Sequence, residues 1–444
     1  PSPTATSTPR PTDTSTPAPT DTPTPPPTDT LTPQPTPTAE PTPTRVPPTP
    51  AITPSSELLE ELDALKAEAE VLRGLPLTLP ITRSLMTRDG LAVYMEQQLA
   101  EEYSPEEVQA EVRVLAAFDF VPQDFDLVSL LADAYSSEVL GMYDDERDTF
   151  YVITDAEGGE LDLVARLTSV HEYTHGIQDE HFALEEFMDG EHLSDDQFLA
   201  RQSLVEGDAT LVMSYYLGTH MDEFSAKELE ALRNRSAEGH QSSLAAAPPI
   251  FRETFNFAYV RGLEFVAALQ ERGWDAVDAA YADPPQSTEQ ILHPEKYLSR
   301  DEPQIVALPP LTDTLGTGWH LVRAETLGEF QMGLFLAQQL DQESVDLASQ
   351  GWDGDQYALY ANNGQGVLVH STVWDSPQDR EEFVTAYQAY AEGKYGLAGT
   401  HGRKTELWWE TPEQTAVLTW EGTTVRVILG PDRVTVLRVL PATR

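Results

Sequence analysis

Apolar residues from about position 55 onward recur mostly at the spacing of an α-helix. A stripe of leucines predicts a charged helix over Ser55 to Leu75, formed by Leu58, Leu59, Leu62, Leu65 and Val71. Similar patterns cover residues 91–99, 105–117, 196–217 and 255–271. A proline-bounded loop is expected over Asp283 to Tyr297. The part of the chain between residues 55 and 314 is therefore predicted to be mainly helical.

One pair of short strands interrupts this helical pattern. Gly141 to Tyr143 and Thr149 to Ile153 flank a polar turn at residues 144–148, which predicts a β-hairpin. Immediately afterwards the spacing becomes helical again, with an apolar stripe at Leu163, Leu167, Val170, Thr174 and Ile177. The order is therefore a hairpin followed directly by an amphipathic helix.

The pattern changes again in the last third of the chain. Helices are predicted over residues 327–340 and 377–392. Strands are predicted over 356–360, 367–374, 406–409, 416–420, 425–428 and 434–440, where apolar residues alternate or cluster in short runs. We expect residues 315–444 to form an α+β domain with an antiparallel sheet and no catalytic signature of its own.

The first 54 residues have a different composition from the rest. Proline and threonine dominate, in repeats such as Pro17-Ala18-Pro19-Thr20-Asp21-Thr22-Pro23. Such a segment cannot bury a core, so an extended, disordered stalk is expected, with a plain flexible tail as the alternative. Stalks of this type commonly hold a domain away from a cell surface. No export signal stands in the given chain, yet an extracellular or cell-surface location is expected.

Charge and cysteine usage narrow the classes of partner and site. The chain carries 74 acidic and 27 basic residues, a formal net charge of −47, and no cysteine. A surface this acidic repels phosphate backbones and anionic lipid headgroups, so nucleic-acid and membrane-surface partners are not expected. No apolar run reaches the length of a membrane span. Without cysteine, disulfides and thiolate metal sites are excluded. The sequence does not determine the oligomeric state.

One motif indicates a chemistry. His171-Glu172-Tyr173-Thr174-His175 reads HExxH and lies on the predicted amphipathic helix. Both histidines then project from one face, one turn apart, where their imidazoles can share a zinc ion. Glu172 between them is suited to act as general base toward a water molecule. This arrangement predicts a Zn²⁺ site with His171 and His175 as ligands.

A catalytic zinc site needs a third protein ligand, and two residues compete for that role. Glu206 lies on a predicted second helix, which a loop allows to pack antiparallel on the first. Its neighbour Gly207 weakens a helix and therefore predicts a close helix contact there. His181 stands where metzincins have a third histidine, but Gln178 replaces the glycine that their turn requires. Glu206 is therefore favoured.

These residues resemble those of a known family. His171-Glu172-xx-His175 with Glu206-Gly207-x-Ala209 resembles the gluzincin branch of the zincin metallopeptidases. The runs Gly141 to Asp144, 171–182, 204–209 and Ser287 to Pro294 are similar to a group of little-characterised secreted bacterial and archaeal proteins assigned to that branch. The resemblance covers about residues 75–308. It implies a zincin-like fold, a zinc ion, proteolysis, and Glu172 as base.

The sequence departs from this family at one position. Many gluzincins place an aspartate four residues after the third ligand, where this chain has Thr210. Asp208 falls on the wrong side of a regular helix, whereas Asp179, one turn beyond His175, is a candidate to orient a ligand.

A further donor is expected near the developing oxyanion of the reaction. His293, followed by Pro294 in a rigid loop and by Tyr297 one turn on, is the preferred candidate catalytic residue. Tyr215 and Tyr216 compete with it. Each of these four side chains also has an ordinary structural role as an alternative.

The sequence thus predicts three regions and one main function. Residues 1–54 form the stalk, 55–314 the zincin-like metallopeptidase domain, and 315–444 the C-terminal α+β domain. The function is peptide-bond hydrolysis of peptide or protein substrates by a secreted or surface-tethered zinc metallopeptidase. The alternatives are an inactive zincin-like binding or scaffold protein with a structural metal, and a zinc hydrolase that acts on another bond.

Overall fold

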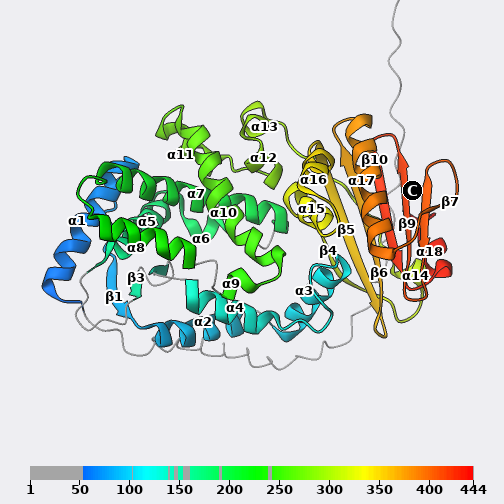
Figure 1. The fold of residues 1–444 in the computed structure, drawn as a ribbon, viewed down its shortest axis with the longest axis horizontal. Helices are drawn as coiled ribbons and strands as arrows, with labels where there is room; N and C mark the ends of the chain where they lie inside the picture. Colours follow the sequence, from blue (N-terminus) through cyan, green and yellow to red (C-terminus); the bar gives the residue numbers. More distant parts are fainter. Residues whose placement is uncertain are drawn as a thin grey trace, which may run out of the picture. The chain divides into compact units, whose positions relative to one another are not determined.

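The computed structural model describes residues 54–102, 104–138, 141–144, 149–153, 161–189, 193–238 and 243–443. All but the last residue of the predicted stalk, and residues 145–148 of the predicted turn, lie outside these ranges. The described residues belong to one compact unit, Pro47–Arg444. This unit is a mixed α+β structure that ends in a large antiparallel sheet, as the sequence predicts (Figure 1).

The first helix, α1 (Ser56–Arg73), has well-defined ends. The Ser55 hydroxyl accepts a hydrogen bond from the backbone of Leu58, and Gly74 ends the helix with a φ of 81°, which suits glycine. Its inner face is not the stripe expected, because Val71 is 77% exposed. The apolar residues buried on that face are Leu58, Leu62, Leu65 and Ala69.

A three-stranded sheet contains the predicted hairpin. β2 (Gly141–Asp144) pairs antiparallel with β3 (Thr149–Ile153), which confirms that pairing. The sequence analysis missed β1 (Thr82–Met86), which pairs with β3 in parallel and gives the order β1-β3-β2. A parallel partner more than sixty residues away leaves no turn signal beside the hairpin, so local pattern reading does not find it.

Three long helices form the centre of the helical part: α5 (Leu163–Phe182), α7 (Asp195–Thr219) and α10 (Pro249–Gln270). α7 and α10 touch backbone to backbone. A Cβ atom added to Gly207 would lie 2.2 Å from the carbonyl group of Gly262. The predicted close helix contact at Gly207 is therefore confirmed, and glycine is required on both sides.

Shorter helices surround this centre. The predicted loop over residues 283–297 contains two of them, α12 (Thr288–Leu292) and α13 (Pro294–Ser299). The others are α2 (Arg88–Glu102), α3 (Pro105–Ala117), α4 (Leu127–Glu138), α6 (Leu184–Phe187), α8 (Ala226–Glu238), α9 (Ser243–Ala246) and α11 (Trp274–Ala282). No described helix has both the length and the apolar character needed to cross a membrane.

The C-terminal part is built on a seven-stranded antiparallel sheet of order β4-β5-β6-β10-β9-β8-β7. Its helices α15, α16 and α17 pack on one face, and α14 and α18 pack on the other. The strands are β4 (His320–Glu325), β5 (Trp352–Asn362), β6 (Gln365–Trp374), β7 (Thr400–His401), β8 (Glu406–Glu410), β9 (Thr415–Glu421) and β10 (Thr424–Gly430). The helices are α14 (Thr312–Leu315), α15 (Gly328–Ala337), α16 (Gln342–Ser349), α17 (Pro377–Tyr395) and α18 (Arg433–Val439).

One predicted strand is wrong. Residues 434–440 form helix α18 rather than a strand. The Asp432 side chain accepts a hydrogen bond from the backbone of Thr435 at 2.8 Å and so caps the first turn. Val436 and Val439 are buried while Val434 is 68% exposed, which is helical rather than alternating burial.

The helical and sheet parts share hydrophobic contacts. Phe118, directly after α3, packs edge-on against Phe335, Tyr357 and His370, with ring centroids 5.2 to 5.9 Å apart. Phe118 therefore belongs to the same buried cluster as the face of the C-terminal sheet. Residues on both sides of position 314 contribute to one continuous packed structure.

Candidate metal centre

Helix α5 brings the two histidines of the HExxH motif together. The Asp162 side chain accepts a hydrogen bond from the backbone of Ala165 at 2.8 Å and starts the helix. One turn apart on this helix, the rings of His171 and His175 have centroids 4.6 Å apart, and their Nε2 atoms are 3.0 Å apart. Both Nε2 atoms thus point toward the same small space.

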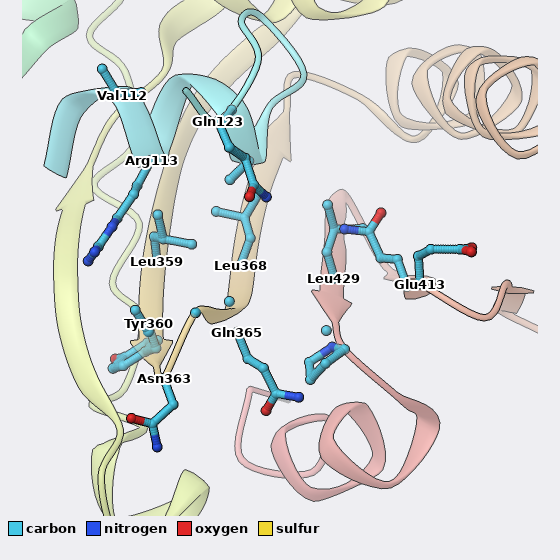
Figure 2. Close-up of a pocket in the computed structure, with 18 of the residues that line it drawn as sticks. Val112, Arg113, Gln123, Leu359, Tyr360, Asn363, Gln365, Leu368, Glu413 and Leu429 are labelled. Carbon is cyan, nitrogen blue, oxygen red and sulfur yellow. The ribbon is translucent and has the colours of Figure 1, made fainter. Parts of the chain in front are cut away.

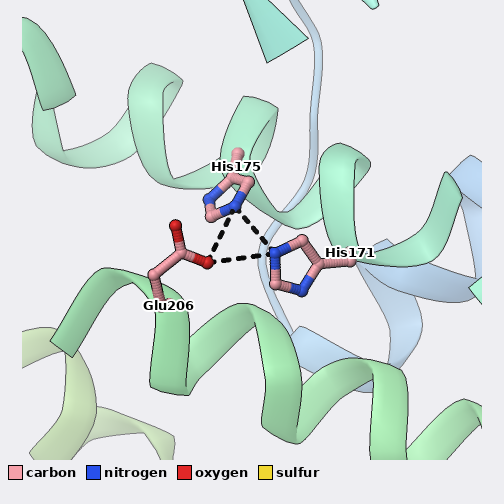
Figure 3. A group of neighbouring side chains, drawn as sticks. All are labelled: His171, His175 and Glu206. Carbon is pink, nitrogen blue, oxygen red and sulfur yellow. Dashed lines mark hydrogen bonds and ion pairs between the residues drawn. The ribbon is translucent and has the colours of Figure 1, made fainter. Parts of the chain in front are cut away.

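Glu206 on α7 points to that same space from the opposite side (Figure 3). Its Oε2 atom lies 3.1 Å from Nε2 of His171 and 3.6 Å from Nε2 of His175. These three are the only group of metal-ligating side chains found among the described residues, with ligand atoms within 4.8 Å of one another. The structure therefore brings together the three residues predicted from the sequence to be metal ligands. His171, His175 and Glu206 are called the metal group below.

The spacing of these atoms fits a tetrahedral zinc ion. Ligand atoms about 2.0–2.2 Å from a tetrahedral zinc lie about 3.3–3.6 Å from each other. The observed separations of 3.0 to 3.6 Å lie within a few tenths of an ångström of that range. Two imidazoles and one carboxylate also match the donor set of catalytic zinc sites, in which a fourth position stays open. The side chains are only 10 to 15% exposed.

Electrostatics favour a positive charge between the three side chains. Burial alone would lower the pKa of His175, but the carboxylates of Glu206 and Glu172 raise it to about 9. Burial would raise the pKa of Glu206, but the two histidines hold it well below its usual range. The Glu206 carboxylate is therefore ionised and available to bind a cation.

A buried amide orients His175. Its Nδ1 atom lies 2.8 Å from Oε1 of Gln178, and the amide nitrogen of Gln178 donates to the carbonyl oxygen of Val205 at 2.9 Å. Sequence reasoning treated Gln178 only as a missing glycine. Side chains three residues apart on a helix are neighbours, so the position of Gln178 after His175 could have predicted this contact.

A tyrosine ring supports His171. The Nδ1 atom of His171 is buried and has no hydrogen-bond partner among the described residues. Instead, the ring of Tyr259 on α10 stacks against it, with centroids 5.9 Å apart and planes inclined by 25°. The sequence analysis missed Tyr259, because nothing in the local pattern of α10 connects it with α5.

Strand β2 holds the candidate general base. The backbone N–H of Tyr143 donates to Oε2 of Glu172 at 2.9 Å. The strand comes so close to α5 that a Cβ atom on Gly141 would lie 2.7 Å from Thr168 and 3.1 Å from Glu172. The other carboxylate oxygen of Glu172 makes no hydrogen bond to any described residue. One oxygen is thus anchored and the other is available.

Two nearby aspartates do not orient the ligands. Asp179 accepts hydrogen bonds from the hydroxyl of Tyr143 and the backbone of Leu184, each at 3.2 Å. Gln178, and not Asp179 as expected from the sequence, is therefore the residue that orients His175. Asp208 is turned away from the metal group, as its position in α7 predicts. It forms a buried ion pair with Arg73, with Nε and Oδ1 2.8 Å apart.

The competing third ligand lies elsewhere. Nε2 of His181 donates to the carbonyl oxygen of Pro76 at 2.7 Å, at the end of α5. This contact holds the end of α5 against the segment that follows α1. The structure therefore groups Glu206, and not His181, with the two motif histidines.

The candidate oxyanion donors are also held outside the metal group. Nε2 of His293 donates to Glu329 of α15 at 3.1 Å, and this hydrogen bond raises the pKa of His293. Tyr297 donates to the carbonyl oxygen of Asp283 at 2.9 Å, and Tyr215 donates to Gln270 at 3.0 Å. The structure does not bring His293 together with His171, His175 and Glu206.

A separate cleft of about 790 Å³ lies between α3 and one end of the C-terminal sheet (Figure 2). Its floor is apolar, its rim carries several amide side chains, and Arg113 and Glu413 are charged residues of its lining. The floor includes Val112, Leu359, Leu368 and Leu429, and the amides include Gln123, Asn363 and Gln365. None of the lining residues belongs to the metal group.

Comparison with known proteins concerns only the C-terminal part. Residues 318–440 match a family model described as "Domain of unknown function (DUF8575)". This match covers the seven strands of the C-terminal sheet and helices α15 to α18, and it contains no residue of the metal centre. No curated protein and no solved structure matches the chain.

Proposed function

We propose that this protein is a zinc metallopeptidase of the gluzincin type, with a zincin-like core, secreted or tethered to the cell surface. The observation that supports this most directly is the convergence of His171, His175 and Glu206 from two helices. Glu172 stands beside them with one oxygen anchored by a backbone amide. These are the donor set and the base that zinc-dependent hydrolysis of a peptide bond uses.

In this proposal, three side chains bind the metal and a fourth transfers protons. His171, His175 and Glu206 would hold zinc, which supplies a Lewis acid that polarises the peptide carbonyl and lowers the pKa of a water molecule. Glu172 takes a proton from that water as its oxygen attacks the carbonyl carbon. Glu172 then passes the proton to the amine nitrogen as the C–N bond breaks. The Tyr143 amide keeps the Glu172 carboxylate in position throughout.

The rival function is a binding or scaffold protein with a structural metal. The cleft beneath α3 supports it, because that cleft provides a recognition surface away from the metal group. Two features favour the enzyme instead. Structural zinc sites are usually closed by four protein ligands, whereas three converge here. A structural site also has no use for the buried carboxylate of Glu172.

A non-peptidase zinc hydrolase would use the same three ligands and the same base. We place peptide bonds first because the resemblance to gluzincins in the sequence extends over both helices that carry the ligands. Cleavage of casein or of a peptide in the test below would favour the peptidase over a hydrolase that acts on another bond.

The test is to replace Glu172 by glutamine in the zinc-loaded protein and measure cleavage of casein and of a peptide library. Zinc content and melting temperature should stay close to wild type, while the rate falls at least about 10²-fold, the usual cost of losing a positioned general base. Glu185→Gln makes the same chemical change at an exposed position and serves as the control. If wild type cleaves no peptide faster than Glu172→Gln does, the peptidase proposal is overturned, and the scaffold and the hydrolase of another bond remain.

A further inference from the structure

Two aromatic rings on α10 lead from the metal group to the protein surface. Phe255 and Tyr259 are one helical turn apart, with ring centroids 5.0 Å apart. Tyr259 in turn stacks on His171, with centroids 5.9 Å apart. Phe255 is 43% exposed, and Tyr259 is partly buried between Phe255 and His171. The rings thus form a continuous apolar strip that begins at a metal ligand and ends in solvent.

The backbone holds this strip in a fixed place. Gly262, one turn beyond Tyr259, touches α7 so closely that a Cβ atom on it would lie 2.2 Å from the carbonyl oxygen of Ser203. α7 also carries Glu206. The position of the rings relative to the metal ligands is therefore set by helix packing and not by a loop.

The charged side chains of α10 form ion pairs with one another. Arg252 pairs with Glu253 at 2.9 Å, and Arg261 pairs with Glu264 at 2.6 Å, so the charges nearest the strip on α10 neutralise each other. In a protein with a net charge of −47, an apolar surface beside the metal group stands out. A single exposed apolar residue is common on protein surfaces. Phe255 differs because its ring contacts Tyr259, which in turn stacks on His171.

We propose that Phe255 and Tyr259 form a substrate subsite that binds an aromatic or large aliphatic side chain of a polypeptide. This inference rests on the proposed peptidase function, because the occupant is the residue next to the bond held at the metal. Aromatic rings prefer offset-stacked or edge-to-face contacts with other rings, so phenylalanine suits an exposed ring such as Phe255. The subsite makes the enzyme select apolar rather than charged sequences.

The first experiment measures kcat/KM for two peptides that differ at one central position, phenylalanine in one and serine in the other. Phe255→Ala should lower the value for the phenylalanine peptide about tenfold, within the range that apolar pockets achieve, and leave the serine peptide unchanged. Val260→Ala is the matched control, because Val260 is 53% exposed but lies on a different side of α10. Phe255→Leu should recover part of the preference.

Unchanged preference in Phe255→Ala, or an equal loss in Val260→Ala, would overturn the subsite.

A second experiment does not depend on turnover. Binding of the same two peptides is measured by fluorescence anisotropy with the zinc-loaded Glu172→Gln protein, with and without Phe255→Ala. Tighter binding of the phenylalanine peptide that disappears with Phe255→Ala supports the subsite, and equal binding of both peptides contradicts it. If wild type cleaves neither peptide, the kinetic comparison gives no preference, and this binding result alone decides the subsite, while the casein and peptide-library test decides the peptidase proposal separately.

Discussion

Gln178 determines which nitrogen of His175 faces the metal group. The amide nitrogen of Gln178 donates to the carbonyl oxygen of Val205 at 2.9 Å, so its carbonyl oxygen must face Nδ1 of His175, 2.8 Å away. In the neutral form of His175 that binds a metal ion, Nδ1 then carries the hydrogen, and the lone pair of Nε2 points toward His171 and Glu206. The backbone carbonyl of Val205, next to Glu206, thereby determines which ring nitrogen of His175 carries the hydrogen.

Replacing Gln178 by leucine should therefore weaken zinc binding about 10- to 100-fold, the usual cost of losing a group that orients a metal ligand. The measurement is a competition titration with a zinc chelator, with circular dichroism to verify that the helices persist. Gln202→Leu makes the same change at a partly buried position of α7 and should leave zinc affinity unchanged. Equal affinities of Gln178→Leu and wild type would show that the amide does not position His175.

The three ligands should differ sharply from His181. His171→Ala and His175→Ala should purify without zinc, because two remaining protein ligands hold the ion too weakly. Glu206→Gln, which keeps the shape and removes the charge, should bind zinc far more weakly than His181→Ala does. Elemental analysis of each purified variant measures this directly, and full zinc occupancy in His171→Ala would contradict the proposed ligand set.

The contact between α7 and α10 should tolerate no side chain. Gly207→Ala places a Cβ atom 2.2 Å from the carbonyl of Gly262, so it should destabilise the fold by at least about 1–3 kcal/mol, as overpacking of a core does. Gly218 lies on the same helix with no atom within 4 Å of an added Cβ. Gly218→Ala should therefore stabilise by up to about 1 kcal/mol, through helix propensity alone. Urea denaturation measures both, and similar effects in the two variants would refute the close contact.

A buried carboxyl group at the start of α7 should make stability depend on pH. Burial raises the pKa of Asp196 to about 7, although it accepts hydrogen bonds from the backbone N–H and hydroxyl of Thr288 at 3.2 and 2.5 Å. In the unfolded chain this pKa is about 3.9. Between these values the folded state binds the proton more tightly, so the contribution of Asp196 to stability falls as pH rises from about 4 to 7.

The test compares melting temperatures of wild type and Asp196→Asn across this pH interval. Wild type should lose several degrees relative to Asp196→Asn as pH rises, because only wild type must ionise a buried group. The exposed Asp341, whose pKa is lowered by hydrogen bonds from Ser344, provides a control. A constant difference between wild type and Asp196→Asn from pH 4 to 7 would contradict the raised pKa.

Local periodicity was enough to predict several elements of this protein. Two histidines one helical turn apart lie on one face wherever the helix packs, so the HExxH group, with Glu172 between them, followed from the sequence. The strand pattern around residues 141–153 identified a hairpin because its two strands are neighbours in the chain. Gly207 indicated a close helix contact because glycine is otherwise unfavourable within a helix.

Tertiary packing decided what local patterns leave open. Whether Glu206 or His181 joins the two histidines depends on how α7 crosses α5, and the roles of Gln178 and Tyr259 depend on contacts with α7 and α10. Residues 434–440 read as a strand because Val434, Val436 and Leu440 resemble an alternating run, yet the cap at Asp432 and burial against the sheet favour a helix. Side-chain contacts between distant segments carry no periodicity along the chain, so only the folded structure reveals them.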